Sequence, residues 1–208
     1  MIRTWIADVS PLMEGKTYEK YYRQVPEERQ KKADKIRYHQ DKALSVGVWV
    51  LYQKALEESG LSGENVFNLS HSGHFVFCSV ADSKSVRTGC DLEMTGTLRM
   101  NVAERFFCRS EWEYIKNKPT KEERTEVFFR YWVLKESFMK ATRLGMKLPL
   151  NAFEIKIGNG VCPELLKKPE EFSEEFYFRE YEDKLHGFHA AVCSEDPDIE
   201  EKLHWVTL

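Results

Sequence analysis

The order of the predicted elements in this chain of 208 residues indicates an α+β protein. Two long segments carry apolar side chains at helical spacing, and several short segments rich in β-branched and aromatic residues predict strands. These elements come in runs instead of alternating, which is typical of α+β folds. The sequence of strand, helices and strands is followed by helices and strands again, with the change near residues 95–100. We therefore expect two similar halves, residues 1–97 and 98–208.

In the first half, residues 2–9 predict a strand because they are rich in β-branched and aromatic side chains. Pro26 and the two glutamates after it suit the first turn of a helix that we expect to reach about His39. A second helix is predicted by apolar residues at helical spacing, and Gly60 and Gly63 end it. These apolar residues are Leu44, Val48, Leu51 and Ala55. Three strands are expected next, over residues 65–69, 74–80 and 85–93.

In the second half, we expect a helix over residues 101–116 and a longer one over residues 121–142. The longer helix has an apolar stripe at Val127, Tyr131, Leu134 and Phe138. Four strands are predicted after it, over residues 153–157, 175–181, 187–193 and 203–208. Neither a linker nor a low-complexity segment separates the halves in the sequence, so we expect them to pack as one unit.

Composition limits the class of protein. The 31 Lys and Arg residues against 34 Asp and Glu residues give a net charge of −3, which argues against a general nucleic-acid binder. The five cysteines are scattered and none lies in a Cys-x-x-Cys pair, so neither a disulfide framework nor a zinc site is expected. The N-terminus has Asp8 in place of a secretory apolar run, and no apolar stretch approaches the roughly 20 residues that span a membrane. We expect a cytoplasmic protein with no membrane contact.

Two groups of charged residues can carry chemistry. Asp91 and Glu93 lie two positions apart on a predicted strand, so they share a face and can hold a hard cation. The alternative is a solvent-facing strand edge. On the helix over residues 121–142, Trp132, Glu136, Lys140 and Arg143 line one face. One interpretation is that these residues form ion pairs on the surface. The other is that the glutamate is a further metal ligand and the lysines neutralise phosphate oxygens.

Two polar segments are ambiguous on their own. Residues 68–73 (NLSHSG) combine hydroxyl groups, an imidazole and a glycine turn, which suits either a phosphate contact or an ordinary turn. A basic stretch between residues 29 and 42 is either a solvated helix face or a contact for an outer phosphate.

Together these segments resemble the 4′-phosphopantetheinyl transferases of the larger surfactin-type (Sfp-type) class. The resemblance runs from about residue 26 to residue 150. Its motifs are residues 68–73, residues 89–93 (GCDLE) with the RFF segment after them, and residues 132–141 (WVLKESFMKA). It implies a pseudo-dimer of two similar α+β halves with the active site in the cleft between them. A monomer is then the expected working unit.

The resemblance also implies an activity. It implies transfer of the 4′-phosphopantetheine arm of coenzyme A to a serine of an apo acyl or peptidyl carrier protein, with Mg²⁺ required and adenosine 3′,5′-bisphosphate released. Asp91, Glu93 and Glu136 are expected to bind Mg²⁺, and Glu111 is a further acid near the metal. Glu136 is also the expected general base, acting directly or through water.

The expected coenzyme A contacts come from both halves. Lys140 contacts the phosphates, Lys135 holds the arm or the motif, and Ser70 and His71 match a phosphate-contacting pair. Three further candidates for the 3′-phosphate are Arg29, Lys31 and Lys35.

One departure from the family leaves an alternative open. Relatives carry a Gly-Lys-Pro segment between the second helix and the NLSHSG strand, and it helps to hold adenine. Here residues 60–67 contain neither Lys nor Pro. Helix two also has Leu44 where relatives often have Arg. The alternative function is that of a non-catalytic relative, which binds coenzyme A or a carrier protein without transfer. A third hypothesis, a metal phosphohydrolase, has no motif of its own in the sequence.

Overall fold

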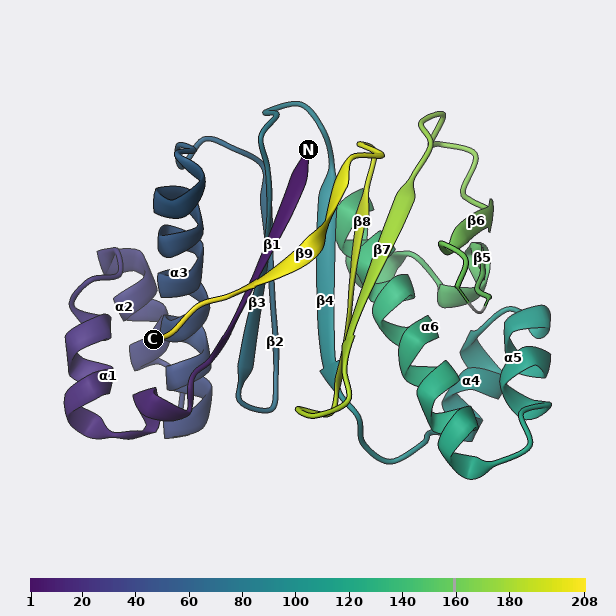
Figure 1. Ribbon diagram of the computed structural model, residues 1–208, viewed down its shortest axis with the longest axis horizontal. Helices are drawn as coiled ribbons and strands as arrows, with labels where there is room; N and C mark the ends of the chain where they lie inside the picture. Colours follow the sequence, from purple (N-terminus) through teal and green to yellow (C-terminus); the bar gives the residue numbers. More distant parts are fainter. Residues whose placement is uncertain (159) are drawn as a thin grey trace.

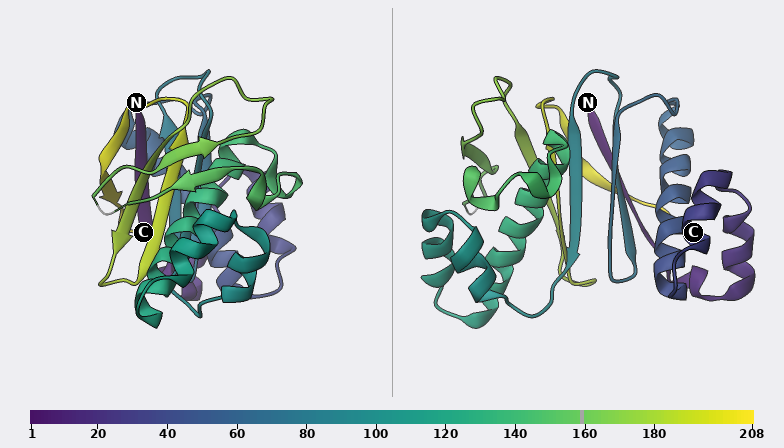
Figure 2. Two further views of the ribbon diagram at one scale, coloured as in Figure 1. Left: turned by 90° about the vertical axis from the view of Figure 1, so that its right-hand side faces the viewer. Right: turned by 180° about the vertical axis from the view of Figure 1, so that it is seen from behind.

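The computed structural model describes residues 1–158 and 160–208 as four layers, with two β-sheets in the middle and helices on both outer sides (Figure 1). The view from behind shows the same order of layers (Figure 2, right). This arrangement confirms the predicted α+β class.

The first sheet has the strand order β2-β3-β1-β9. Its strands are β1 (Ile2–Asp8), β2 (Phe67–Ser72), β3 (Phe75–Ala81) and β9 (Ile199–Trp205). β1 and β2 both run antiparallel to β3, whereas β9 joins β1 in parallel from the far end of the chain. The last strand of the sequence therefore completes the sheet that the first strand begins.

Helices of the first half cover the outer face of this sheet. They are the 3-10 helix η1 (Ser10–Met13), α1 (Gly15–Tyr22), α2 (Glu27–Asp34) and α3 (His39–Ser59). The predicted stripe of α3 packs against Trp5, Val76 and Cys78 of the sheet. α3 ends at Gly60, which adopts a left-handed conformation with φ 67° that glycine tolerates best.

The second sheet has the order β4-β8-β7, and α6 lies across its outer face. The elements of this half are β4 (Thr88–Met94), α4 (Met100–Phe106), α5 (Arg109–Lys116), α6 (Lys121–Thr142), η2 (Gly145–Lys147), η3 (Leu150–Ala152), β5 (Glu154–Lys156), β6 (Glu164–Lys167), β7 (Tyr177–Asp183) and β8 (Phe188–Ser194). β5 and β6 form a small separate hairpin.

A shared apolar core joins the inner faces of the two sheets. Ile6 and Phe77 of the first sheet pack with Leu92, Ala190 and Val192 of the second. Successive residues of a strand point to opposite faces, and each sheet is covered on both sides. This explains why β3 and β8 are buried along their whole length and read as continuous apolar runs.

Gly89 is the point where β4 and α6 approach most closely. A Cβ atom at this position would lie 2.2 Å from the Ser137 carbonyl oxygen and 2.3 Å from the Ala141 backbone nitrogen. Only a residue without a side chain fits there, because the opposing atoms belong to the helix backbone and cannot rotate away. This contact sets the distance between the residues of β4 and those of α6.

The structure corrects several predicted element boundaries. The helix expected over residues 26–39 is the shorter α2, which closes with a turn from Ile36 N–H to the Ala33 carbonyl. The helix expected over residues 101–116 is split into α4 and α5, because Phe107 is extended and Cys108 begins a new helix. α1 and β6 were not predicted, and the final strand ends at Trp205 instead of residue 208.

Two strands cross the predicted boundary between the halves. β4 precedes residue 97 but pairs with β8 of the second half, and β9 follows it but pairs with β1 of the first. In the described part of the chain, no helix is long and apolar enough to cross a membrane.

We expect Gly89→Ala to lower the free energy of unfolding by about 1–3 kcal/mol or more, because the added methyl group overpacks a backbone contact. Gly96→Ala is the matched control, since a Cβ there would make only ordinary contacts at 3.7 and 3.8 Å. Urea denaturation of the two variants measures the difference. Equal effects of the two substitutions would contradict this role of Gly89.

Candidate functional site

The two carboxylates of β4 point toward α6, as their spacing predicted. Cys90 and Leu92 lie in the core between the sheets, whereas Asp91 and Glu93 take the opposite face. Asp91 is buried and Glu93 is partly exposed. The strand therefore offers two acidic side chains, one above the other, to the helix that covers it.

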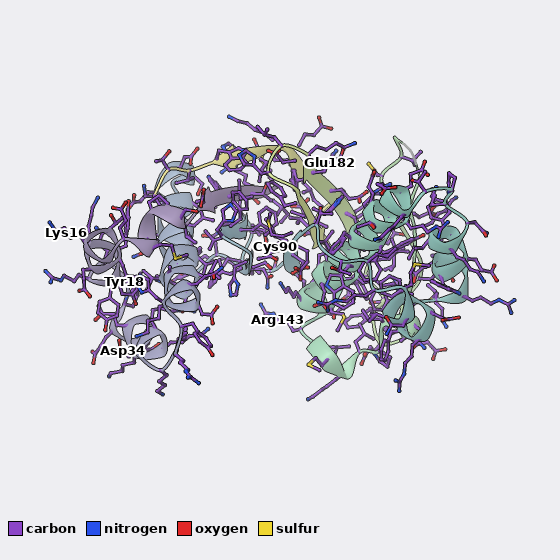
Figure 3. The ribbon with its side chains drawn as sticks, turned by 90° about the horizontal axis from the view of Figure 1, so that it is seen from below. Lys16, Tyr18, Asp34, Cys90, Arg143 and Glu182 are labelled. Carbon is purple, nitrogen blue, oxygen red and sulfur yellow. The ribbon has the colours of Figure 1, made fainter. Side chains whose placement is uncertain are left out.

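Lys140 of α6 connects three elements at this point. Its ammonium donates to Asp91 Oδ1 at 2.8 Å, to Ser70 Oγ at 3.0 Å and to the Cys90 carbonyl at 3.0 Å. Ser70 Oγ in turn donates to Asp91 Oδ1 at 2.9 Å. β2, β4 and α6 thus meet around one charged pair, and Cys90, labelled in Figure 3, marks the place where the two halves adjoin.

Glu136 lies one helical turn before Lys140 and shares the electrostatic environment of the β4 carboxylates. Burial and the negative charges of Asp91 and Glu93 raise the pKa of Glu136 above its usual value. Burial likewise raises the pKa values of Asp91 and Glu93. Burial opposes the charged form of Lys140, but the Asp91 carboxylate outweighs it and raises the pKa of Lys140. Three carboxylates therefore share the neighbourhood of a single positive group, the Lys140 ammonium, which pairs with Asp91.

These residues fit a hard divalent cation. Asp91 Oδ2 is buried and has no hydrogen-bond partner among the residues that the structure describes. The neighbouring carboxylates destabilise one another, and oxygen ligands are those that Mg²⁺ prefers. Within residues 1–158 and 160–208, no group of three or more Asp, Glu, His or Cys side chains is placed to hold a metal ion by itself. Mg²⁺ commonly uses one or two carboxylates together with water and substrate phosphates, so an incomplete protein cage suits it.

Further cations surround His71 at the end of β2. Desolvation and the positive charges of Lys140 and Lys32 lower the pKa of His71. Arg143 ends α6 in a left-handed conformation with φ 60°, unusual for a residue other than glycine. Figure 3 shows the Arg143 side chain in the space between the two halves. An anion that reaches this place meets several positive groups.

The three candidates for the 3′-phosphate lie on and just after α2, and the structure gives them separate partners. The Arg29 guanidinium stacks over the Trp49 ring at 4.1 Å from its centroid. Lys31 pairs with Glu27 at 2.6 Å on the exposed face of the helix, and Lys35 is exposed at the helix end. The cation of α2 that influences His71 is Lys32, which we did not single out as a site residue.

Glu111 and Lys135 form a buried ion pair. Lys135 Nζ lies 2.8 Å from Glu111 Oε1 and also donates to the carbonyls of Leu150 and Phe153. Glu111 accepts hydrogen bonds from the backbone N–H groups of Cys108 and Ile155. The pair therefore ties α5 and α6 to the segment before β5, which agrees with the expectation that Lys135 holds the motif. The expected place of Glu111 near the metal stays a prediction.

Two residues of the NLSHSG segment have contacts that we did not anticipate. Asn68 Oδ1 accepts from the Cys90 N–H at 3.0 Å, and Ser72 Oγ donates to Glu93 Oε2 at 2.8 Å. The signal was present in the sequence, because Asn68, Ser70 and Ser72 alternate along the strand and must share one face.

A small cavity of about 150 Å³ adjoins Glu93. Phe128, Phe129 and Trp132 of α6 form its apolar wall, and Arg99 adds a positive charge. All its lining residues belong to β4, α6 and the segment that connects β4 to α4. The cavity thus lies between the second sheet and α6, beside one of the predicted metal ligands.

The fold and this site define an α+β protein in which three carboxylates and a lysine lie between a sheet and a helix. The comparisons with known proteins identify the family. The model of the 4′-phosphopantetheinyl transferase superfamily matches residues 87–193, more than half of the chain. The chain therefore belongs to the 4′-phosphopantetheinyl transferase superfamily.

Several relatives carry the same name. The chain is similar to the 4′-phosphopantetheinyl transferase Sfp of Bacillus subtilis, at 36% identity over 68% of this chain and 60% of the relative. It is also similar to HetI of Nostoc, at 40% identity over 43% of this chain and 35% of the relative. The Thermotoga maritima holo-[acyl-carrier-protein] synthase has a TM-score of 0.44 and 22% identity, covering 52% of this chain and 61% of that one. The chain thus spans about 60% of the first of these relatives.

We expect Glu111→Gln to lower the free energy of unfolding by about 3–5 kcal/mol, because it leaves the buried Lys135 ammonium without its counter-charge. Glu113→Gln on the same helix removes only an exposed pair with Arg109 and should cost about 0.5 kcal/mol or less. Urea denaturation compares the two variants. If Glu111→Gln were as stable as the Glu113 variant, the structural role of the buried pair would be refuted.

Proposed function

We propose that this chain transfers the 4′-phosphopantetheine arm of coenzyme A to a serine of an apo acyl or peptidyl carrier protein. The reaction depends on Mg²⁺ and releases adenosine 3′,5′-bisphosphate. The observation that carries this proposal is the cluster in which Lys140 joins Asp91 and Ser70, with Glu93 and Glu136 beside it. Membership of the transferase superfamily supports the same activity.

Asp91, Glu93 and Glu136 would hold the cation, and the unpartnered Asp91 Oδ2 supports this choice. When bound there, Mg²⁺ neutralises the negative charge on the pyrophosphate oxygens of coenzyme A. Lys140 supplies a second positive charge from the same side and remains protonated, because Asp91 raises its pKa. Ser70 and His71 extend the phosphate contacts along the end of β2.

The reaction is an in-line displacement at phosphorus. The carrier serine oxygen forms a bond to the β-phosphorus, and the bond from that phosphorus to the bridging oxygen breaks, so the bisphosphate leaves with the electron pair. Glu136 takes the serine proton, directly or through a water molecule. A carboxylate that also binds the cation is a weak base, so direct transfer and relay through water both stay open. Charge grows on the phosphate oxygens in the transition state, where Lys140 stabilises it most.

The two halves, residues 1–97 and 98–208, are proposed to act as one unit and as a monomer. The exchange of β4 and β9 across the boundary supports this, because neither sheet is complete without residues from both sides of it. Coenzyme A and the carrier protein are then the partners of a single chain. The localisation in the cytoplasm remains a prediction from the sequence.

The activity is tested by incubating the protein with coenzyme A, Mg²⁺ and several unmodified acyl and peptidyl carrier proteins. Mass spectrometry of each carrier should show the added phosphopantetheine. No mass gain on any carrier would refute transfer. Calorimetry that then showed tight coenzyme A or carrier binding would establish the non-catalytic relative instead.

We expect Glu136→Gln to slow transfer by roughly 10² to 10⁴-fold, because the amide keeps the shape of the side chain but cannot accept the serine proton. Glu122→Gln changes an exposed residue in the first turn of the same helix and should leave the rate unchanged. Initial rates on one carrier measure both, with circular dichroism to confirm folding. A normal rate in Glu136→Gln would exclude the proposed base.

His71 should make coenzyme A binding depend on pH. Its lowered pKa leaves the imidazole neutral at about pH 7, and a bound phosphate favours the protonated form. Binding then takes up a proton, so affinity should rise as the pH falls from about 7.5 to about 5.5. Calorimetry without metal measures coenzyme A affinity at each pH for the wild-type protein and for His71→Gln. The titration of the ligand itself is the same in both series, so it cancels when the two are compared. Parallel pH profiles would contradict the contact.

A further inference from the structure

β2 and β4 face each other as edge strands of different sheets, and side chains connect them. The strand orders place β2 at one edge of the first sheet and β4 at one edge of the second. Asn68 Oδ1 accepts from the Cys90 N–H at 3.0 Å, and Ser72 Oγ accepts from the Met94 N–H at 3.1 Å. Polar side chains of β2 thus occupy the positions that carbonyl groups of a neighbouring strand would take in a regular ladder.

Ser72 makes a second hydrogen bond in addition to its backbone contact. Its hydroxyl lies 2.8 Å from Glu93 Oε2. A hydroxyl has one proton and two lone pairs, whereas the Met94 N–H can only donate. The Met94 bond therefore uses a lone pair and leaves the Ser72 proton for the Glu93 carboxylate. The Met94 N–H of β4 thus orients the Ser72 hydroxyl, and this hydroxyl orients the Glu93 carboxylate.

Ser70 offers an informative comparison. It contacts Asp91 in the same way, at 2.9 Å, but its oxygen also accepts from the Lys140 ammonium. Ser70 therefore belongs to the charged centre itself, whereas the contacts of Ser72 are a backbone group and a single carboxylate. Ser70 and Ser72 lie two positions apart on β2, and Asp91 and Glu93 lie two positions apart on β4. Each serine therefore hydrogen-bonds one of the two acids.

We propose that Ser72 is a positioning residue for Glu93. It holds Oε2 of this carboxylate and so limits the orientations in which Glu93 meets the cation of the transfer reaction. This inference rests on the proposed function, because it assigns Glu93 to the cation. Hydrogen bonds to ligating carboxylates typically change metal affinity or activity by roughly 10 to 100-fold when they are removed. Ser72→Ala should therefore weaken cation binding by about 10-fold or more.

The experiment uses three variants of the full chain. Ser72→Ala removes the hydroxyl, and Ser72→Thr retains it on a side chain that suits a strand. Ser79→Ala is the matched control. Ser79 lies in β3, is fully buried, and its Oγ lies 3.4 Å from Thr88 Oγ1, so this variant removes a buried hydroxyl at the same sheet interface without touching a carboxylate. Thermal unfolding of all three verifies that they fold.

Two measurements follow for each variant. The first is the Mg²⁺ concentration that gives half the maximal transfer rate, which should rise about 10-fold in Ser72→Ala while the rate at saturating Mg²⁺ changes little. The second is Mn²⁺ binding in the presence of coenzyme A and without a carrier protein, followed by electron paramagnetic resonance. It should weaken by the same factor and recover in Ser72→Thr. The second measurement does not depend on turnover.

Weaker Mn²⁺ binding in Ser72→Ala, with normal binding in Ser72→Thr and Ser79→Ala, supports the inference. Unchanged Mn²⁺ binding in Ser72→Ala, or an equal loss in Ser79→Ala, overturns it, as does a wild-type protein that binds no Mn²⁺. A wild-type protein that binds Mn²⁺ but transfers nothing would refute the proposed function alone, and the Mn²⁺ titrations would still decide the role of Ser72.

Discussion

The absence of a side chain at Gly89 determines how the rest of the site can be built. A Cβ atom at this position would meet the backbone of α6 at 2.2 Å, so the helix lies directly on β4. Close contact brings Lys140 within 2.8 Å of Asp91 and places Glu136, one helical turn before Lys140, within reach of the charges of Asp91 and Glu93. A larger residue would move the helix outward, and the charged pair would then no longer span the gap. One small residue in the GCDLE segment thus controls the distances among the charged groups that follow it.

The acidic side chains of the site outnumber the positive groups that pair with them. Lys140 compensates Asp91, but Glu93 and Glu136 add two negative charges that no ammonium or guanidinium among the described residues neutralises by an ion pair. Burial is the main cause of the raised pKa of each carboxylate, and for Glu93 and Glu136 the negative charges beside them add to it. A divalent cation would relieve this repulsion. The site therefore gains more from binding a cation than an isolated surface carboxylate would.

Sequence patterns captured what depends on local periodicity. α6 has the predicted bounds because its apolar stripe and its capping residues act within the helix itself, and Asp91 and Glu93 share a face because a strand alternates. The partners of Glu111 and Lys135 were out of reach, since 24 positions separate them and only packing of α5 on α6 brings them together. α1 was not predicted, although Tyr18 and Tyr21 form a buried face on it. The last strand was predicted over residues 203–208, whereas β9 spans Ile199–Trp205, because a parallel partner 197 positions away gives no local signal for where the strand begins.

The junction between the halves is formed by side chains of β2 that hydrogen-bond to β4. In an ordinary backbone ladder, carbonyl groups of β2 would accept from the N–H groups of β4, and the β2 side chains would not be needed for this contact. Asn68, Ser70 and Ser72 satisfy the edge of β4 with side chains instead, and two of these residues bond the acids directly. Polar groups that must be satisfied at an exposed edge thereby also orient carboxylates. The interface that joins the halves and the site between them consequently use the same residues, so neither can change without the other.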